Sequence, residues 1–357
     1  MKTSLYEMHK ALGAKLLDFA GWDMPIQYKN LKQEVIAVRE NCGVFDVSHM
    51  GEFFVTGEEA VKFVDELVTN DIKNAELLKA IYSPLCREDG TIIDDLIVYK
   101  LTETNLMICV NAANIDKDFN WIKEKSKDYS VELTNRSDDY SLVAVQGPNT
   151  FKILKSLNLE TELQDIPYYS IQTTDLTAKT PVLFARTGYT GEDGFEIFGP
   201  HEYIKSVWSQ LMNAGVEPCG LGSRDVLRLE VCYPLYGHEL NDDVTPIESG
   251  LKWTVKLNKS AFIGKDTLSL NKINSQLIKF TLDKGIPRDG YKIINSNKEE
   301  IGLVTSGTMS VSLNKGIGIA RVIKEKYNKD EKYEIEIRNK TFPINITNKA
   351  FVNGGHK

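Results

Sequence analysis

The sequence predicts an α+β fold whose last part is rich in β-strand. Before about residue 232, apolar residues recur at helical spacing in several segments, and strand-like runs lie between these segments. From about residue 275 onward, short alternating runs are separated by Gly and Asn, which is typical of a small antiparallel sheet or barrel. The 357 residues are enough for two or three domains of ordinary size.

The first part of the chain contains three predicted helices and one hairpin. Residues 31–42 and 58–69 each place apolar side chains on one helical face, and a third helix fits 114–127. The two apolar runs of 92–111 are separated by a short polar stretch around Glu103, which predicts a β-hairpin.

The middle of the chain alternates strands and helices. The run 141–154 begins as a strand that stops at Gly147, and Pro148 is well placed to open the helix that follows. Ser223 is expected to cap the last helix of this region. The other elements predicted here are strands at 182–186 and 194–198 and helices at 201–213 and 223–232.

Composition and charge exclude several classes of protein. Fifty acidic residues against 43 basic ones give a net charge of −7, which argues against a protein that mainly coats nucleic acid or an anionic membrane. The five cysteines form no CxxC pair and no metal-ligand spacing, so we expect free thiols and no metal site. No apolar run approaches the roughly 18 residues that span a bilayer, and the N-terminus lacks the apolar centre of a signal peptide. We therefore expect a cytoplasmic protein that binds neither nucleic acid nor membrane.

Two adjacent carboxylates, Asp94 and Asp95, lie inside the apolar run 92–99. Neighbouring strand residues point to opposite faces, so the two acids are not expected to act as one paired acid–base unit. Burying either acid is costly unless it is hydrogen-bonded, paired or neutral, so folding alone does not explain their presence. The alternative interpretation is structural: one acid caps a β-bulge and the other faces water.

The expected hairpin brings a carboxamide to this strand. If the turn centres near Glu103–Thr104, the numbers of paired residues sum to about 206–207, which sets Asp95 opposite Asn111 or Ala112. A carboxylate and a carboxamide on one stretch of sheet could hold a polar ligand while apolar neighbours exclude water.

Two further segments carry polar side chains of interest. The Gly-rich loop within 186–196 presents Tyr189 and leads into a strand that carries Glu196, and its spacing matches no phosphate-binding motif. It is either a hairpin loop that presents a ligand-binding aromatic residue and an acid, or an ordinary turn. Arg224 and Arg228 share a helical face, and Arg228 lies in an apolar stretch, so it needs either an anionic ligand or a structural salt bridge.

The five histidines do not support covalent or zinc catalysis. None has HExxH-like spacing, and none accompanies a Ser or Cys in a recognisable nucleophile motif. A hydrolase that uses a nucleophilic Ser or Cys, or a zinc ion, is therefore not supported.

A series of sequence blocks, taken in order along the chain, carries a family resemblance. The blocks are LDFAGWDMPIQY at 17–28, GVFDVSHMG at 43–51, IIDDLIVY at 92–99, VNAAN at 110–114, VQGP at 145–148, RTGYTGEDGFE at 186–196, LGSRDVLRLE at 221–230, LYGHEL at 235–240 and FIGK at 262–265. Together they resemble the aminomethyltransferases of the glycine cleavage system, the T-proteins, over nearly the whole chain.

This resemblance implies a three-domain cloverleaf around a central folate channel. A central α+β domain would comprise 1–50 plus 140–260, an inserted α+β domain 51–139, and a small antiparallel β-barrel 275–357. The implied reaction transfers the methylene of an aminomethyl group from the lipoyl arm of a carrier, the H-protein, to tetrahydrofolate. It would release ammonia and form 5,10-methylenetetrahydrofolate and dihydrolipoyl H-protein. No metal is implied, and we expect a monomer.

The resemblance also implies roles for nine residues. Asp95 would be the catalytic carboxylate, which stabilises positive charge as ammonia leaves and orients or deprotonates the attacking nitrogen. Asn111 would line the same site, Glu196 would hold the pterin edge, and Arg228 would lie near that ring system. The other residues expected at the folate site are Met50, Tyr82, Tyr99, Tyr189 and Tyr236.

One departure from the family and two alternative functions are also noted. The tail, 349–357, differs from the usual family ending, which puts contacts from the last residues to folate or carrier in doubt. The alternatives are a tetrahydrofolate-dependent demethylase of the same superfamily and a non-enzymatic folate-binding factor of iron–sulfur assembly. The block 93–98 favours the aminomethyl reaction, and the segment 232–239 lacks the Lys-Gly and Gln of the assembly-factor motif.

Overall fold

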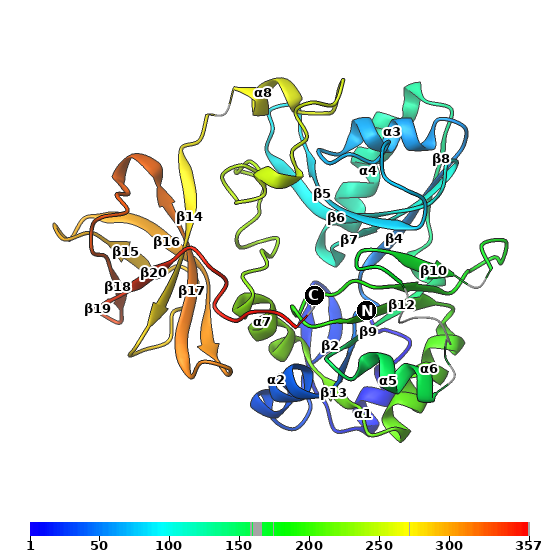
Figure 1. Ribbon diagram of the computed structural model, residues 1–357, viewed down its shortest axis with the longest axis horizontal. Helices are drawn as coiled ribbons and strands as arrows, with labels where there is room; N and C mark the ends of the chain where they lie inside the picture. The colour runs from blue at the N-terminus through cyan, green and yellow to red at the C-terminus, as the bar shows by residue number, and fades with distance from the viewer. Residues whose placement is uncertain (158, 160–165, 174, 271, 356–357) are drawn as a thin grey trace.

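The computed structural model describes residues 1–157, 159, 166–173, 175–270 and 272–355. Three lobes, each built around its own β-sheet, meet near the centre of the molecule (Figure 1). The α+β class and the three-lobed cloverleaf predicted above are confirmed. The limits given for the three domains stay a proposal, and His356 and Lys357 of the tail lie outside the described residues.

The central lobe is a mixed six-stranded sheet in the order β10-β11-β12-β9-β3-β13, in which only β3 and β13 pair in parallel. Its strands are β3 (Gly43–Asp46), β9 (Ser141–Gln146), β10 (Ile171–Thr173), β11 (Leu183–Ala185), β12 (Gly194–Gly199) and β13 (Glu217–Cys219). Its helices are α1 (Tyr6–Ala11), α2 (Leu31–Glu40), α5 (Thr150–Ser156), α6 (His201–Asn213) and α7 (Leu221–Glu230). A two-stranded hairpin, β1 (Lys15–Phe19) and β2 (Trp22–Gln27), precedes α2.

The second lobe is an antiparallel five-stranded sheet in the order β5-β6-β7-β4-β8, covered by two helices. The helices place their buried apolar side chains on the sheet, and Ile122 of α4 is fully buried there. The strands are β4 (Gly51–Thr56), β5 (Lys79–Cys86), β6 (Ile92–Thr102), β7 (Asn105–Val110) and β8 (Glu132–Asn135), and the helices are α3 (Ala60–Leu67) and α4 (Ile115–Lys125).

The third lobe is a curled antiparallel half-barrel of seven strands in the order β19-β18-β15-β16-β17-β14-β20. Its inner side chains, such as Phe280 and Val322, form a separate apolar core. The strands are β14 (Ser275–Leu282), β15 (Lys292–Ile294), β16 (Glu300–Ser310), β17 (Lys315–Ile323), β18 (Glu334–Ile337), β19 (Lys340–Pro343) and β20 (Asn345–Thr347). The predicted C-terminal barrel is thus confirmed as a partly open one.

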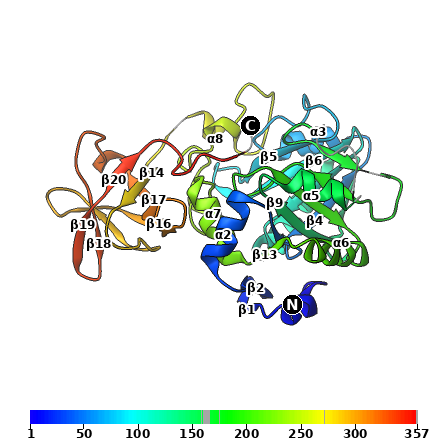
Figure 2. The ribbon, with the colours of Figure 1, turned by 60° about the horizontal axis from the view of Figure 1, so that its bottom comes forward.

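Helix α7 joins the central lobe to the half-barrel. It packs against α2 and β2 on one side and against β16 and β17 on the other, and both views show it between the two lobes (Figures 1 and 2). The buried carboxylate of Glu230, at the end of α7, accepts hydrogen bonds from Arg39 at 2.9 Å and from the Ser310 hydroxyl at 2.7 Å. This carboxylate therefore links α2, α7 and the half-barrel.

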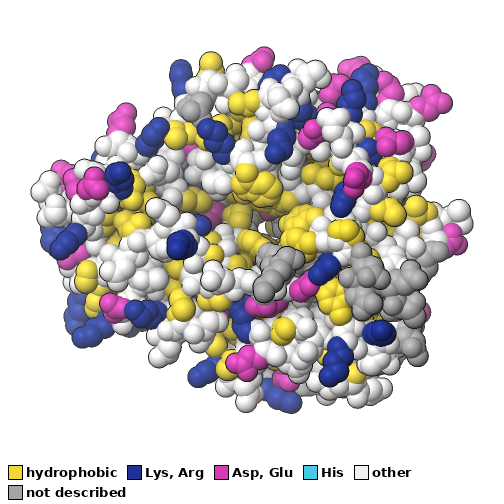
Figure 3. Space-filling model, viewed as in Figure 1, with side chains coloured by type: hydrophobic (Ala, Val, Ile, Leu, Met, Phe, Trp, Pro, Cys, Tyr) yellow, Lys and Arg dark blue, Asp and Glu magenta, His cyan; other side chains and the backbone are white. Residues whose placement is uncertain are grey.

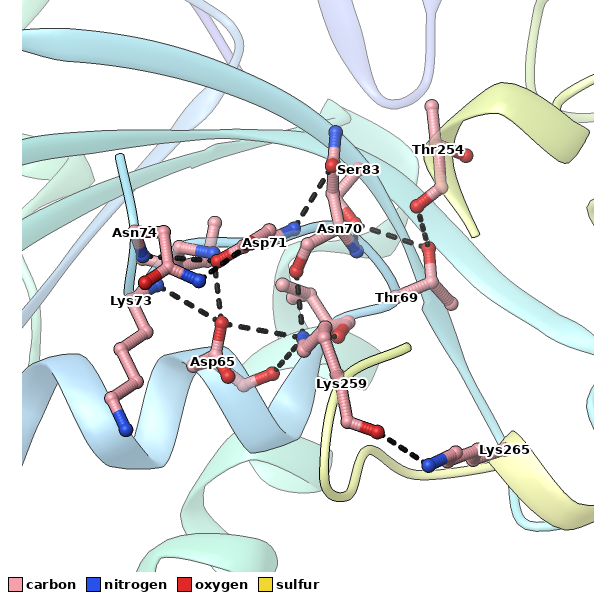
Figure 4. A network of polar contacts seen from close by, with 12 residues as sticks. Asp65, Thr69, Asn70, Asp71, Lys73, Asn74, Ser83, Thr254, Lys259 and Lys265 are labelled. Carbon is pink, nitrogen blue, oxygen red and sulfur yellow. Dashed lines mark hydrogen bonds and ion pairs between the residues drawn. The ribbon is translucent and has the colours of Figure 1, made fainter. Parts of the chain in front are cut away.

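The segment that leads from α7 to α8 (Lys265–Ser269) is fixed to the second lobe by Lys259. The buried ammonium of Lys259 donates hydrogen bonds to the carbonyl oxygens of Asp65, Val68 (2.9 Å) and Asn70 (2.7 Å), just where α3 ends (Figure 4). The Asp65 carboxylate lies 3.4 Å from the same ammonium. A cation is well suited to this position because the last carbonyls of a helix carry partial negative charge.

The predicted elements agree with the structure except at some ends. The hairpin of 92–111 is confirmed, and its pairs, such as Ile97 with Cys109, have the predicted number sum. The helix after β9 begins at Thr150, two residues beyond Pro148. The prediction of Ser223 as an N-cap is wrong, because the cap is Gly220 and the Ser223 hydroxyl donates to the Gly220 carbonyl oxygen from inside α7. No helix among the described residues is long and apolar enough to cross a membrane.

Candidate active site

A cavity of about 590 Å³ lies where the three lobes meet. On the face shown in Figure 3, hydrophobic side chains gather around the hollow at the centre of the molecule. All nine residues predicted for the folate site line this one cavity. They are Met50, Tyr82, Asp95, Tyr99, Asn111, Tyr189, Glu196, Arg228 and Tyr236.

Asp95 is held on the cavity wall by two side chains. The Tyr82 hydroxyl donates to Asp95 Oδ2 at 2.9 Å, and the Asn111 amide Nδ2 donates to Asp95 Oδ1 at 2.9 Å. Tyr82 comes from β5, the neighbour of β6, and Asn111 directly follows β7 on the other side. The carboxylate is therefore oriented from both sides, by Asn111 through the hairpin that the sequence predicted and by Tyr82 through the β5–β6 pairing, which it did not.

Burial raises the pKa of the Asp95 carboxyl to about 7, and the nearby charge of Asp94 also raises it. The hydrogen bonds from Tyr82 and Asn111 act in the opposite direction, because they stabilise the charged form. A carboxylate with a pKa near neutrality can accept a proton at working pH and release it again, which suits a general base.

Asp94 lies on the opposite face of β6 and is fully buried. It accepts hydrogen bonds from the Asn111 backbone N–H at 3.1 Å, from Asn111 Nδ2 at 2.8 Å and from Asn114 Nδ2 at 2.7 Å. The place of Asp95 on the cavity wall fits a ligand-binding role, while the structural alternative stays open, because a register shift opposite Leu85 lies beside Asp94 and Asp95 is partly exposed. The two acids nevertheless share the Asn111 amide, so they are less independent than their opposite faces predicted.

Another part of the cavity wall carries an incompletely paired acid and base. Glu196 accepts a hydrogen bond from the Thr187 hydroxyl at 2.6 Å, and its carboxylate lies 3.8 Å from Arg224 Nη2. Arg224 Nη1 is buried and has no hydrogen-bond partner among the described residues, and the guanidinium lies over the Tyr189 ring at 5.1 Å. A buried donor without a partner is costly, so this part of the cavity wall is suited to a polar ligand.

Arg228 lines the cavity but has protein partners for its guanidinium. It donates to Asp225 at 2.9 Å, to Glu239 at 3.0 Å and to the Ser306 hydroxyl at 2.8 Å. Its place on the cavity wall agrees with the prediction, while its bonding fits the structural salt bridge that the sequence left open. Arg224, and not Arg228, is therefore the arginine with a donor free for a ligand, although the sequence alone did not distinguish the two.

Aromatic side chains form much of the remaining wall. Tyr82 stacks on Trp253, with ring centroids 6.0 Å apart and ring planes 23° apart, and Trp253 is 58% exposed at the cavity edge. The Tyr236 hydroxyl accepts a hydrogen bond from the Lys117 ammonium at 2.7 Å. Flat rings of this kind can hold a planar ligand. The sequence did not single out Trp253, because an exposed aromatic residue carries no local signal of its neighbours.

Within the described part of the chain, no group of three or more His, Cys, Asp and Glu side chains is placed to hold a metal ion. The described cysteines are all free thiols.

Comparison with known proteins gives the same assignment for both parts of the chain. Residues 5–259 match the family model described as the GCVT N-terminal domain, and residues 276–353 match the glycine cleavage T-protein C-terminal barrel domain. Curated relatives named aminomethyltransferase include one from Thermosipho melanesiensis, 47% identical over 360 residues, covering 99% of this chain and 98% of the relative. Another, from Thermotoga maritima, is 48% identical over 330 residues, covering 90% of each chain.

A solved structure agrees with these sequence relatives. The crystal structure of glycine cleavage system aminomethyltransferase T from Bartonella henselae matches with a TM-score of 0.93 and 28% identity, covering 99% of this chain and 98% of that one. These findings do not favour the demethylase or the iron–sulfur assembly factor. The family predicted from the sequence blocks is confirmed: this chain belongs to the aminomethyltransferases, the T-proteins of the glycine cleavage system.

Proposed function

We propose that this chain transfers the methylene of an aminomethyl group from the lipoyl arm of an H-protein to tetrahydrofolate, with release of ammonia. The observation that carries the proposal is the Asp95 carboxylate, oriented by Tyr82 and Asn111 on the wall of an otherwise largely apolar cavity. Family membership supplies the reaction class, and this carboxylate supplies a group that the reaction requires.

Asp95 is proposed to serve the reaction in two ways. As an anion in a low-dielectric cavity, it stabilises positive charge at the reacting carbon while ammonia leaves. With a pKa near 7, it can also accept a proton from the attacking nitrogen. Tyr82 and Asn111 keep both oxygens in place, so little reorganisation is needed when charge develops.

The part of the cavity wall around Glu196 is proposed to bind the pterin. A pterin edge offers adjacent N–H donors, which a carboxylate can accept in pairs. The unpartnered Arg224 Nη1 lies next to Glu196 and offers a donor to a ligand carbonyl. The walls formed by Met50, Tyr99 and Tyr189 would cover the ring faces. Arg228 supports this wall through its bond to Glu239, and Tyr236 lies nearer the edge beside Lys117.

Partners and location stay predictions. The H-protein is proposed as the carrier because the family uses it, and we expect the chain to act as a monomer in the cytoplasm, where free cysteines such as Cys232 stay reduced.

The test is a reconstituted assay with aminomethylated H-protein, in which ammonia and methylenetetrahydrofolate are measured with and without tetrahydrofolate. We expect fast ammonia release that depends on tetrahydrofolate, with one methylenetetrahydrofolate formed per ammonia. Folate binding without turnover would contradict the proposal, and methyl donors would then be tested as substrates.

A further inference from the structure

Asp118, on α4, is a buried acid that the proposed mechanism does not use. Its side chain is fully buried, and neither carboxyl oxygen receives a hydrogen bond from an N–H or O–H group of another described residue. An ionised carboxylate in such a place lacks the donors that normally compensate for lost hydration. The neutral, protonated acid is therefore the form that this site favours.

The acid next to Asp118 is Asp94: α4 packs on β6, and Asn114, one helical turn before Asp118 on the same helix face, donates to Asp94 at 2.7 Å. Two carboxylates cannot hydrogen-bond unless one of them carries a proton. Asp94 has three donors, one backbone N–H and two side-chain amides from Asn111 and Asn114, at 2.7 to 3.1 Å. Asp118 has none. Donors stabilise an anion, so Asp94 is the charged member of the pair and Asp118 holds the proton.

We propose that Asp118 is a protonated carboxylic acid whose O–H donates to Asp94, and that it thereby keeps a negative charge directly behind Asp95. Asp118 touches no substrate and acts through Asp94, so it is a positioning residue for the proposed reaction. Asp94 in turn fixes the Asn111 amide that orients Asp95.

The surrounding charges agree with this assignment. Burial raises the pKa of both acids, but the donors on Asp94 act against this rise, whereas the charge of Asp94 raises the pKa of Asp118 further; Lys117 on the same helix lowers the pKa of Asp118. From β6, Asp95 also raises the pKa of Asp118. The raised pKa of Asp95 depends in part on the charge of Asp94, so the proton on Asp118 contributes to setting the pH at which Asp95 becomes a base.

Three variants test the inference through the pH profile of kcat/KM. The quantity compared is the position of the acid limb, which is the pH range over which kcat/KM falls as Asp95 takes up a proton. Asp118→Asn keeps an N–H donor toward Asp94, so the limb should stay within about 0.3 pH units of the wild type. Asp118→Leu removes the donor, so Asp94 takes up a proton, Asp95 loses its charged neighbour, and the limb should shift to lower pH by about one unit. Asp116→Leu, at an exposed position on the same helix, is the matched control and should leave the limb in place.

An infrared measurement tests the proton without relying on activity. At pH 9, where Asp95 is ionised, the wild-type spectrum minus the Asp118→Asn spectrum should contain the C=O band of one protonated, buried carboxylic acid, because buried Glu52, whose pKa is also raised, contributes equally to both proteins and cancels. A difference spectrum without this band would overturn the inference. An equal shift of the acid limb in Asp118→Asn and Asp118→Leu would also overturn it. If the assay shows no transfer at all while the band behaves as expected, the proposed function fails and the proton assignment stands.

Discussion

Replacing Tyr82 with Phe should move the acid limb of the pH profile upward. The Tyr82 hydroxyl donates a 2.9 Å hydrogen bond to the Asp95 carboxylate, which stabilises the ionised form. A hydrogen bond to a charged group contributes about 1.5–3 kcal/mol. Because one pKa unit corresponds to about 1.4 kcal/mol, losing this bond should raise the pKa of Asp95 by roughly one to two units. The expected pKa in the variant is therefore about 8–9, against about 7 in the wild type.

The sign of the effect follows from which form is active. Asp95 acts as an anion, so activity is present above its pKa and is lost as the pH falls through it. At pH 7 the variant should have roughly 5- to 50-fold lower kcat/KM, and this loss should be recovered at higher pH. The measurement is kcat/KM for ammonia release between pH 5.5 and about 9.5, with aminomethylated H-protein as the substrate. Burial lowers the pKa of His49, the cavity histidine, to about 4, so that group does not define the limb.

Tyr189→Phe is the matched control for this experiment. Its hydroxyl donates to the Pro234 carbonyl oxygen on another part of the wall, so the limb should keep its position even if substrate affinity changes. In Tyr82→Phe the ring remains and can still stack on Trp253. An acid limb at the wild-type pH in Tyr82→Phe would refute the reasoning, because it would mean that Asp95 is not the group that titrates.

The remaining predictions concern catalysis, binding and stability. Asp95→Asn keeps the shape of the side chain and removes its charge, so folate affinity should change by less than about threefold while turnover falls by roughly 10²–10⁴-fold; normal turnover would exclude Asp95 as the catalytic carboxylate. Glu196→Ala should weaken folate binding, measured by calorimetry, by at least about tenfold, because a charged acceptor is lost and Arg224 is left unpaired. An unchanged Kd would show that Glu196 is not part of the pterin site. Lys259→Met should lower the free energy of unfolding by about 3 kcal/mol in urea titrations, because three backbone oxygens lose their buried donor. The control, Lys252→Met at an exposed position, should change the free energy of unfolding by less than about 0.5 kcal/mol. Equal effects would contradict the role given to the buried ammonium.

The position of Asp95 beside Asn111 could be predicted from the sequence because antiparallel pairing obeys simple arithmetic. Once the turn near Glu103 is recognised, the register fixes which residues face each other across the hairpin. The helices of the first lobes were predictable for a similar reason, since a 3.6-residue period shows directly which face is buried.

The distinction between Arg224 and Arg228 could not be made in this way. Both arginines lie on one face of α7, and the choice depends on Glu239 and Ser306, which arrive from a later loop and from another lobe. The contacts of Lys259 could not be predicted from the sequence either, because their acceptors are backbone carbonyl oxygens, which every residue type has.

The buried position of the Lys259 ammonium has a consequence for chemical labelling. Lys259 is buried and its ammonium donates to three backbone oxygens, so an amine-directed acylating reagent should modify exposed Lys252 long before Lys259. Asn70 connects the Lys259 ammonium to the cavity wall: its carbonyl oxygen accepts from Lys259, and its side-chain amide donates to the Tyr82 carbonyl oxygen at 2.9 Å. The rate at which Lys259 becomes labelled therefore reports how often the segment before α8 detaches from the end of α3.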